Sequence, residues 1–309
     1  MRFQHRSFDE GGHRFTELID QANGFRILAD HAGAELISIA RKDPNGAWHG
    51  YLYRDGDFSA PADGWKNHAT VMGYYIHRLL GEHTLYEGEE IRGGNHSFLR
   101  TKQFPDPEII LNGRATLQFH LSADRIEKWE YPRRVEFWLD YTLAEDHLEV
   151  RFTFKNLEGD RPAHLSFGLH PGFAVSSIES ARVILPKGTY RRHIAPDNFL
   201  SGETVDFVSE GGPMSFKPFE LPGSFLIEPL EWEESIVRLH DYGANREVAV
   251  DLAEPPFFTI WSDLHPFICI EPCWGLPDHH QQRAFEQKIG IQVIPAQTTL
   301  TRSCSFRFR

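Results

Sequence analysis

The sequence contains very few cysteines. Among its 309 residues only three are cysteine, namely Cys269, Cys273 and Cys304. A small and odd number of thiols cannot build the disulfide framework of a small secreted protein. We therefore expect a protein of a reducing compartment.

Long apolar segments are also missing. The sequence has no run of about 18 apolar residues, the length that a membrane-spanning helix needs. The amino terminus, MRFQHRSFDEGGHRF, lacks the apolar core of a signal peptide. We expect a cytoplasmic protein without a membrane partner.

Basic residues are too few for a nucleic-acid partner. The chain has 32 Lys and Arg against 44 Asp and Glu, a formal net charge of −12. Binding to a phosphate backbone requires a basic surface. The composition, 40% hydrophobic and 25% charged, is that of a globular protein. A neutral small-molecule ligand, or a locally basic pocket, fits this charge balance better.

Metal-ligand patterns are weak. Cys269 and Cys273 have a spacing that zinc could use, but no second Cys or His pair at a comparable spacing completes four ligands. The 17 histidines include the adjacent His279 and His280, whose side chains would point to opposite faces of an extended chain. We predict no metal and no cofactor, and expect the two thiols to be packed in the interior.

Alternation of apolar and polar residues is the dominant pattern. It runs through VEFWLDYTL (135–143) and HLEVRFTFKN (147–156), and the short AED between them predicts a hairpin. Another hairpin is predicted around DPNGAW, where Asn45-Gly46 would supply the positive φ angles of a tight turn. No long segment keeps a helical period. The sequence predicts an all-β protein, a β-sandwich formed by one domain over residues 1–309.

One acidic residue interrupts an apolar strand. In PFICIEP (266–272), alternation places Cys269 and Glu271 on one face and Ile268 and Ile270 on the other. Pro272 cannot donate to a sheet ladder, so we expect the strand to end there. HLSFGLHPGF repeats this pattern, with His170 directly before a proline.

Two strand ends of this kind can bring a carboxylate and an imidazole to one cleft. Burial would then raise the pKa of Glu271 and make it a better general base near neutral pH. The competing interpretation is structural, since a single Glu near a strand end is commonly an ion-pair partner and a His before Pro is commonly a packed, hydrogen-bonded residue.

Three segments carry a family resemblance. In their order and spacing, the segments SFGLHPGF, FTIWSDLHPFICIEPCWGLPD and KIGIQVIPAQTTL resemble segments of the aldose 1-epimerase (galactose mutarotase-like) superfamily. The carboxy-terminal third most resembles its LacX-type branch. The resemblance implies a large β-sandwich that converts one anomer of a sugar into the other. It also implies that Glu271 is the general base, that His170 is the general acid, and that no metal or nucleotide takes part.

The resemblance also implies residues that bind the sugar. GGNHSFLR offers His96 near the anomeric centre, with Asn95 before it and Arg100 after it, and YYIHRLLGE offers Arg78. Of the tryptophans that could stack on a sugar, we expect Trp274 to contact it.

We expect core packing for the other such tryptophan, Trp261. The chain also departs from the family in two motifs: HPYF reads HPGF, with Gly172 in place of an aromatic residue, and HGF reads HSF, with Ser97 in place of glycine.

Several functions stay open at this stage. The altered motifs are compatible with a carbohydrate-binding or regulatory protein that has lost turnover. Arg78 and Arg100 are compatible with an epimerase acting on a phosphorylated hexose, despite the acidic net charge. A metal-dependent lyase is weaker, because no histidine pair shows compact ligand spacing with a carboxylate. The sequence leaves open which sugar binds and whether the chain forms a homodimer.

Overall fold

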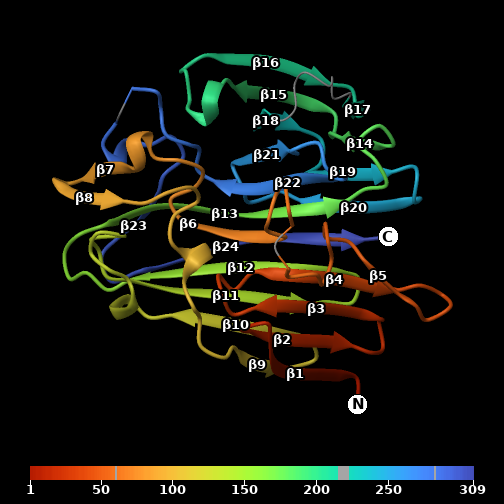
Figure 1. The fold of residues 1–309 in the computed structure, drawn as a ribbon. Helices are drawn as coiled ribbons and strands as arrows, with labels where there is room; N and C mark the ends of the chain where they lie inside the picture. The colour runs from red at the N-terminus through yellow and green to blue at the C-terminus, as the bar shows by residue number, and fades with distance from the viewer. Residues whose placement is uncertain (60, 215–222, 282) are drawn as a thin grey trace.

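The protein is built almost entirely from antiparallel strands. The structure, a computed structural model, describes residues 1–59, 61–214, 223–281 and 283–309. Strands run side by side from β1 at the bottom of Figure 1 to β16 at the top, and the described residues form no α-helix. None of the described helices is long or apolar enough to cross a membrane. The predicted all-β class is confirmed.

The strands of the described ranges form three large sheets and a small one. The first sheet has the order β1 (Phe3–Glu10), β2 (His13–Asp20), β3 (Phe25–Asp30), β4 (Leu36–Lys42) and β5 (Trp48–Gly50). The nine-stranded sheet has the order β17 (Pro213–Met214), β14 (Ala181–Ile184), β19 (Ile236–Asp241), β20 (Arg246–Asp251), β24 (Thr299–Phe308), β12 (His147–Asn156), β11 (Val135–Leu143), β10 (Ala115–Leu121) and β9 (Glu108–Leu111). The eight-stranded sheet has the order β16 (Thr204–Ser209), β15 (Gly188–His193), β18 (Phe225–Trp232), β21 (Phe257–Trp261), β22 (Phe267–Trp274), β13 (Ala163–Ala174) and β23 (Gln292–Ile294), and β6 (Ala69–Tyr74) also pairs with β13.

The remaining elements are short. Strands β7 (His83–Tyr86) and β8 (Glu89–Arg92) pair with each other. Among the described residues, five 3-10 helices lie in the connections, namely η1 (Leu80–Glu82), η2 (Leu99–Thr101), η3 (Ala123–Arg125), η4 (Pro196–Asn198) and η5 (Phe285–Gln287).

The hairpin of β11 and β12 shows why alternation predicts these strands. Buried and less buried residues alternate along the whole of β11, and the pairing runs from Val135 opposite Asn156 to Leu143 opposite Leu148. One face of the hairpin therefore meets the core and the other meets solvent, as the two-residue period requires.

The DPNGAW hairpin also forms, but with a longer turn than predicted. Lys42 of β4 pairs with Trp48 of β5, and the carboxylate of Asp43 accepts hydrogen bonds from the backbone N–H groups of Asn45 and Ala47. Gly46 has φ 86°, whereas Asn45 does not have a positive φ. The two-residue turn expected from Asn45-Gly46 was wrong, because the Asp43 side chain organises a wider loop.

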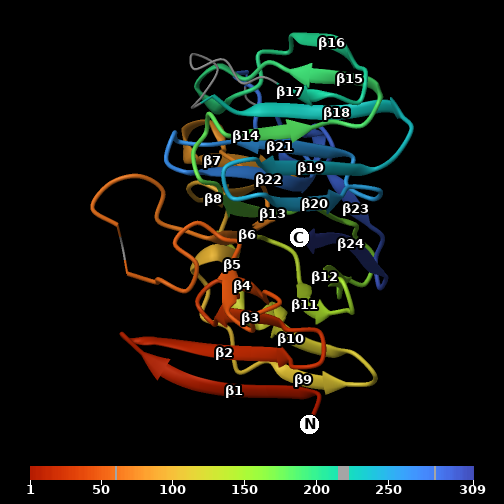
Figure 2. The same cartoon turned by 90° about the vertical axis from the view of Figure 1, so that its right-hand side faces the viewer.

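Aromatic side chains join the nine-stranded and eight-stranded sheets face to face. Phe152 and Phe154 of β12 contact the ring of Phe167 on β13 at centroid distances of 5.2 and 4.6 Å. Phe167 in turn stacks on Trp274 of β22 at 4.9 Å. Figure 2 shows the strands of both sheets after a turn of 90°, with the right-hand side of Figure 1 facing the viewer. These rings fill the space between two sheets with one apolar core.

The two prolines after His170 and Glu271 do not end their strands. Strand β13 continues to Ala174 and β22 continues to Trp274, so the expected strand ends were wrong. The ladder between the two strands is interrupted over residues 169–171 and 270–272, a gap that contains both prolines, which lack an N–H donor, and the same register holds on both sides of the gap.

Each strand is kept extended by its other neighbour. Strand β13 pairs with β6 through His170 opposite Thr70, and β22 pairs with β21 through Glu271 opposite Thr259. His170 and Glu271 therefore lie opposite each other in the middle of the sheet rather than at its rim.

Candidate active site

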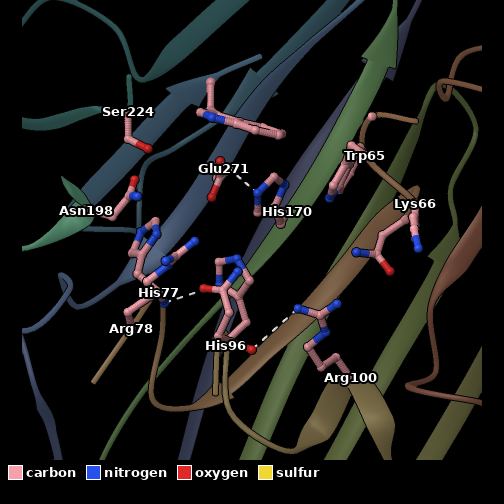
Figure 3. A pocket seen from close by; sticks show the side chains of 14 residues that line it. Trp65, Lys66, His77, Arg78, His96, Arg100, His170, Asn198, Ser224 and Glu271 are labelled. Carbon is pink, nitrogen blue, oxygen red and sulfur yellow. Dashed lines mark hydrogen bonds and ion pairs between the residues drawn. The ribbon is translucent and has the colours of Figure 1, made fainter. Parts of the chain in front are cut away.

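A cavity of about 510 Å³ lies over the middle of the eight-stranded sheet (Figure 3). It is lined by Gly64, Trp65, Lys66, Asn67, His77, Arg78, Asn95, His96, Arg100, His170, Asn198, Ser224, Trp261 and Glu271. All of the residues predicted for the site line this cavity, except Trp274. The sheet supplies the floor through β13, β21 and β22, and loops before β6, after β6, before η2 and before β18 supply the walls.

The centre of the floor is a histidine–carboxylate pair. The Nε2 atom of His170 lies 3.4 Å from Oε1 of Glu271, and the two side chains point toward each other in Figure 3. The shared register of β13 and β22 sets this distance, because residues opposite each other on neighbouring strands project from the same face. Glu271 is only 1% exposed.

Burial controls the protonation of this pair. It raises the pKa of Glu271 well above its usual value and lowers the pKa of His170 to about 3, with His77 and Arg100 adding to the latter. Both effects favour the uncharged forms, so the pair holds one proton, on the carboxyl group, while the cavity is empty. One proton shared by two groups in contact is what a coupled acid and base require.

The backbone around His96 fixes the direction of its ring. His96 and Ser97 both have left-handed backbone angles, φ 60° and 63°. The backbone N–H of His77 donates to Nδ1 of His96 at 3.2 Å, and the His96 N–H donates to the carbonyl of His77 at 2.6 Å. Burial lowers the pKa of His96 well below its usual value, so the ring is neutral and carries its proton on Nε2.

Ser97 accounts for one departure from the family motif. Glycine is the residue that best tolerates its left-handed angle, and serine there is strained. The hydroxyl oxygen of Ser97 accepts the backbone N–H of Tyr74 at 3.0 Å, at the end of β6. This hydrogen bond offsets the strain and ties the His96 loop to the strand that pairs with β13.

Positive charges surround the pair. Lys66, Arg78 and Arg100 line the cavity, and Glu271 is the sole acidic residue among its described lining residues. Arg100 donates to the carbonyl of Asn95 at 3.4 Å, whereas no bond of the Arg78 or Lys66 side chain is found within the described ranges. Two of the three cationic groups are thus available to a ligand.

A buried ion pair supports the loop that carries Arg78. The Nζ atom of Lys288 lies 2.5 Å from Oδ1 of Asp278, and both side chains are nearly inaccessible. Asp278 holds the loop at Arg78 and at Leu80, because its backbone N–H donates to the carbonyl of Arg78 and its Oδ2 accepts the N–H of Leu80.

The two tryptophans lie the opposite way round from the positions expected of them. Trp274 is fully buried between Phe152 and Phe167, so its assignment as a sugar contact was wrong. Alternation along β22 contained this information, because Trp274 differs from Glu271 by an odd number of residues and therefore faces the core. Trp261 lines the cavity, because it pairs with Cys269, which shares the face of Glu271.

Sequence reasoning missed Trp65. Its ring stacks on His170 at a centroid distance of 4.9 Å, and its backbone N–H donates to Asp263 at 2.7 Å. A Cβ atom added at Gly172 would lie 2.3 Å from Cζ3 of Trp65. The glycine of the HPGF motif therefore makes room for an aromatic ring that arrives from a distant loop.

His77 was also missed, although it precedes the predicted Arg78. Its ring nitrogen Nε2 lies 3.5 Å from the hydroxyl of Thr259, and burial lowers its pKa to about 4. One signal in the sequence was its place in YYIHRLLGE, directly beside a residue that we had selected.

Two groups of side chains on this floor have the donors of a metal site. The first is His170, Cys269 and Glu271, and the second is His77, Cys273 and Glu271; within each group one ligand atom per residue lies within 4.8 Å of the others. The spacing of the cysteines alone did not reveal these groups, because each histidine comes from a different strand or loop.

Comparisons with known proteins agree on one family and one fold. The profile of the family described as aldose 1-epimerase matches residues 17–300. A galactose mutarotase related enzyme from Lactobacillus acidophilus is 20% identical, with a TM-score of 0.80 over 99% of this chain and 97% of that one. A galactose mutarotase-like protein from Lactobacillus casei is also 20% identical, with a TM-score of 0.77 over 99% and 100%.

A more distant neighbour has the same fold. The galactose 1-epimerase from Lactobacillus acidophilus is 10% identical, with a TM-score of 0.74 over 99% of this chain and 98% of that one. No curated protein matches the sequence. At such low identities these structures establish the shared fold.

Proposed function

Because the chain belongs to the aldose 1-epimerase family, we propose that it interconverts the α and β anomers of a hexose by general acid–base catalysis. The observation that carries this proposal is the His170–Glu271 pair, 3.4 Å apart on the floor of a cavity large enough for a sugar. Opening a pyranose ring requires proton transfer at two oxygens bonded to the same carbon, so acid and base must be close neighbours.

Glu271 takes the proton of the anomeric hydroxyl, and His170 delivers a proton to the ring oxygen. The proton that the pair shares first moves from the carboxyl group to the imidazole, which leaves the carboxylate as base and the imidazolium as acid. Rotation about the bond between the first two carbons then exposes the other carbonyl face. Ring closure with the roles reversed gives the other anomer and restores the pair.

The remaining cavity residues orient the sugar. The Nε2–H group of His96 is a donor directed by its backbone contacts, and its ring meets that of His170 edge-on at 5.2 Å. It is placed to hydrogen-bond an oxygen near the anomeric carbon. Trp65 and Trp261 offer apolar ring faces, and Arg78 and Asn95 offer donors for hydroxyl groups.

The magnitudes are sufficient for a reaction that also proceeds in water. Positioned general acid or base catalysis contributes typically about 10²–10⁴-fold. Holding the sugar in one orientation adds to this, and no covalent intermediate is needed.

The cationic walls favour a second candidate, a phosphorylated hexose. Lys66, Arg78 and Arg100 make the cavity positive within a chain of net charge −12. A phosphate group would neutralise this charge, since Arg in particular binds phosphate through paired hydrogen bonds. The same acid and base would act on either sugar.

Proton NMR of anomer exchange, on a panel of free and phosphorylated hexoses, tests the proposal. Glu271→Gln keeps the shape of the side chain but cannot accept the proton, so exchange should fall by about 10²-fold or more. Glu231→Gln, at an exposed position of β18, is the matched control and should leave exchange unchanged.

Two results would contradict the mechanism. If the Glu271→Gln protein exchanges anomers at the wild-type rate, Glu271 is not the general base. Wild-type protein that binds a sugar but accelerates exchange of no sugar in the panel would instead indicate a carbohydrate-binding protein.

A further inference from the structure

Two thiols flank the proposed base, and the proposed reaction uses neither. Cys269 and Cys273 stand two residues before and two residues after Glu271 on β22, so alternation puts all three side chains on one face. Both thiols are buried and free of disulfide bonds. Buried thiols beside a carboxylate and an imidazole are the ligand types that Zn²⁺ prefers.

The group of His170, Cys269 and Glu271 has nearly the dimensions of a zinc site. One ligand atom from each residue lies within 4.8 Å of the others. With metal–ligand bonds of about 2.0–2.3 Å in a tetrahedral site, ligand atoms lie roughly 3.3–3.7 Å apart. Shifts of about 1 Å by side chains would therefore close the group around an ion.

The carboxylate of Glu271 provides an independent indication of a ligand. Its Oε2 atom is buried and has no hydrogen-bond partner within the described parts of the chain. A buried oxygen without a partner costs free energy, and a cation would supply the missing partner.

We propose that His170, Cys269 and Glu271 bind a thiophilic divalent cation such as Zn²⁺, and that the bound ion inhibits the protein. The ion enters from the cavity, which His170 and Glu271 line, and Cys269 completes the site from the interior side. The thiol of Cys269 and the carboxyl group of Glu271 both release their protons to solvent on binding, and His170 binds as neutral imidazole. The fourth position faces the cavity, and both proton-transfer groups are occupied by the metal.

The second group is less suited to a metal, because its ligand atoms already have partners. The hydroxyl of Thr259 lies 3.5 Å from the His77 ring nitrogen and 3.8 Å from the sulfur of Cys273. An ion there would have to replace these contacts, whereas no hydrogen bond is found for the sulfur of Cys269 within the described residues.

The surrounding charges make the ion a reversible inhibitor. Lys66, Arg78 and Arg100 line the same cavity and repel a cation, while the thiolate and the carboxylate attract it. The affinity should therefore be weaker than that of a structural zinc site, and a chelator should remove the ion. Mg²⁺, which binds oxygen ligands, should not occupy the site.

Titration with Cd²⁺ tests the site without relying on catalysis. A cadmium–thiolate bond gives an ultraviolet charge-transfer band, which should reach its maximum near one equivalent of Cd²⁺ in wild-type protein. Cys269→Ser should abolish the band, and Cys304→Ser, in β24 and outside both groups, should retain it. The absence of a band in wild-type protein, or a band that survives in Cys269→Ser, would overturn the proposal.

Anomer exchange tests the inhibition, which rests on the proposed function. Zn²⁺ should inhibit exchange, a chelator should restore it, and Mg²⁺ should have no effect. Cys269→Ser should raise the inhibitory Zn²⁺ concentration by at least about tenfold, since losses in metal sites are commonly of this size. If the wild-type protein accelerates anomer exchange for no sugar, the proposed function fails, and the cadmium titration still decides whether the metal site exists. If Cd²⁺ binds but Zn²⁺ leaves anomer exchange unchanged, the inhibition is refuted.

Discussion

Replacing Gly172 by alanine should push Trp65 away from His170. The added Cβ atom would lie 2.3 Å from Cζ3 and 3.1 Å from Cε3 of the tryptophan, and 3.2 Å from the ring of Phe267. Carbon atoms in contact are normally about 3.5–4.0 Å apart, so the indole must move by roughly 1 Å or more. It is the indole that has to move, because Gly172 is held by pairing with Cys269 and Trp65 comes from a loop.

The displacement should act on catalysis as well as on folding. Trp65 stacks on the imidazole of His170 at 4.9 Å and lines the cavity. Misplacement of a site residue by about 1 Å can reduce a rate by about 10²-fold. We expect anomer exchange by Gly172→Ala to fall by about tenfold to 10²-fold, with a loss of unfolding free energy of about 1–3 kcal/mol from overpacking.

A double-mutant cycle separates this mechanism from general damage. In a Trp65→Ala background the added methyl group has no indole to displace, so Gly172→Ala should have little further effect on kcat. Gly159→Ala is the control, because a Cβ atom there meets nothing within 4 Å. NMR exchange rates and urea unfolding measure both quantities. Equal effects of Gly172→Ala with and without Trp65 would refute the reasoning.

Three further predictions concern the framework of the site. Ser97→Ala should lower the unfolding free energy by about 1–3 kcal/mol, because the N–H of Tyr74 loses its acceptor while the left-handed angle remains strained; Ser97→Gly should lose less in the same urea titration, and the reverse order would contradict the prediction. Burial lowers the pKa of His68 to about 4, so as pH falls the unfolded chain binds a proton at this residue before the folded chain does. The unfolding free energy should therefore fall by about 3 kcal/mol as pH drops from 6.5 to 4. In His68→Asn the slope of unfolding free energy against pH should be smaller by up to one proton over this range, and an unchanged slope would exclude this residue. Asp278→Asn should destabilise the fold by about 3–5 kcal/mol, because Lys288 is left unpaired. It should also raise KM for the sugar more than it lowers kcat, because Asp278 holds the loop that carries Arg78. An unchanged KM would show that the ion pair does not position this loop.

The sequence predicted well what depends on local periodicity. Alternation in residues 135–143 and 147–156 depends only on which face of each strand meets the core, and the predicted hairpin forms with strands at these bounds. The DPNGAW turn was less predictable, because the side chain of Asp43 competes with the tight turn that Asn45-Gly46 favours.

Site residues could be predicted where a motif carries them, and were missed where only the fold does. His170 and Glu271 were selected from short motifs and lie together on the cavity floor. Trp65 has no motif of its own. It reaches His170 because the loop between β5 and β6 folds over the sheet, and only the unexpected Gly172 indicated that space had been made for another ring.

The error at the two prolines shows how the sheet can position an acid and a base. A proline removes one ladder bond, and in a strand with a single partner this would end the pairing. Here both prolines fall within one short gap in the ladder between β13 and β22, on either side of the His170–Glu271 pair, while β6 and β21 keep the two strands extended from outside. The distance between His170 and Glu271 is thereby set by paired strands, whereas Lys66, Arg78 and Arg100 are carried by loops and a short helix. Changes of sugar specificity can therefore arise in these loops without disturbing the proton-transfer pair.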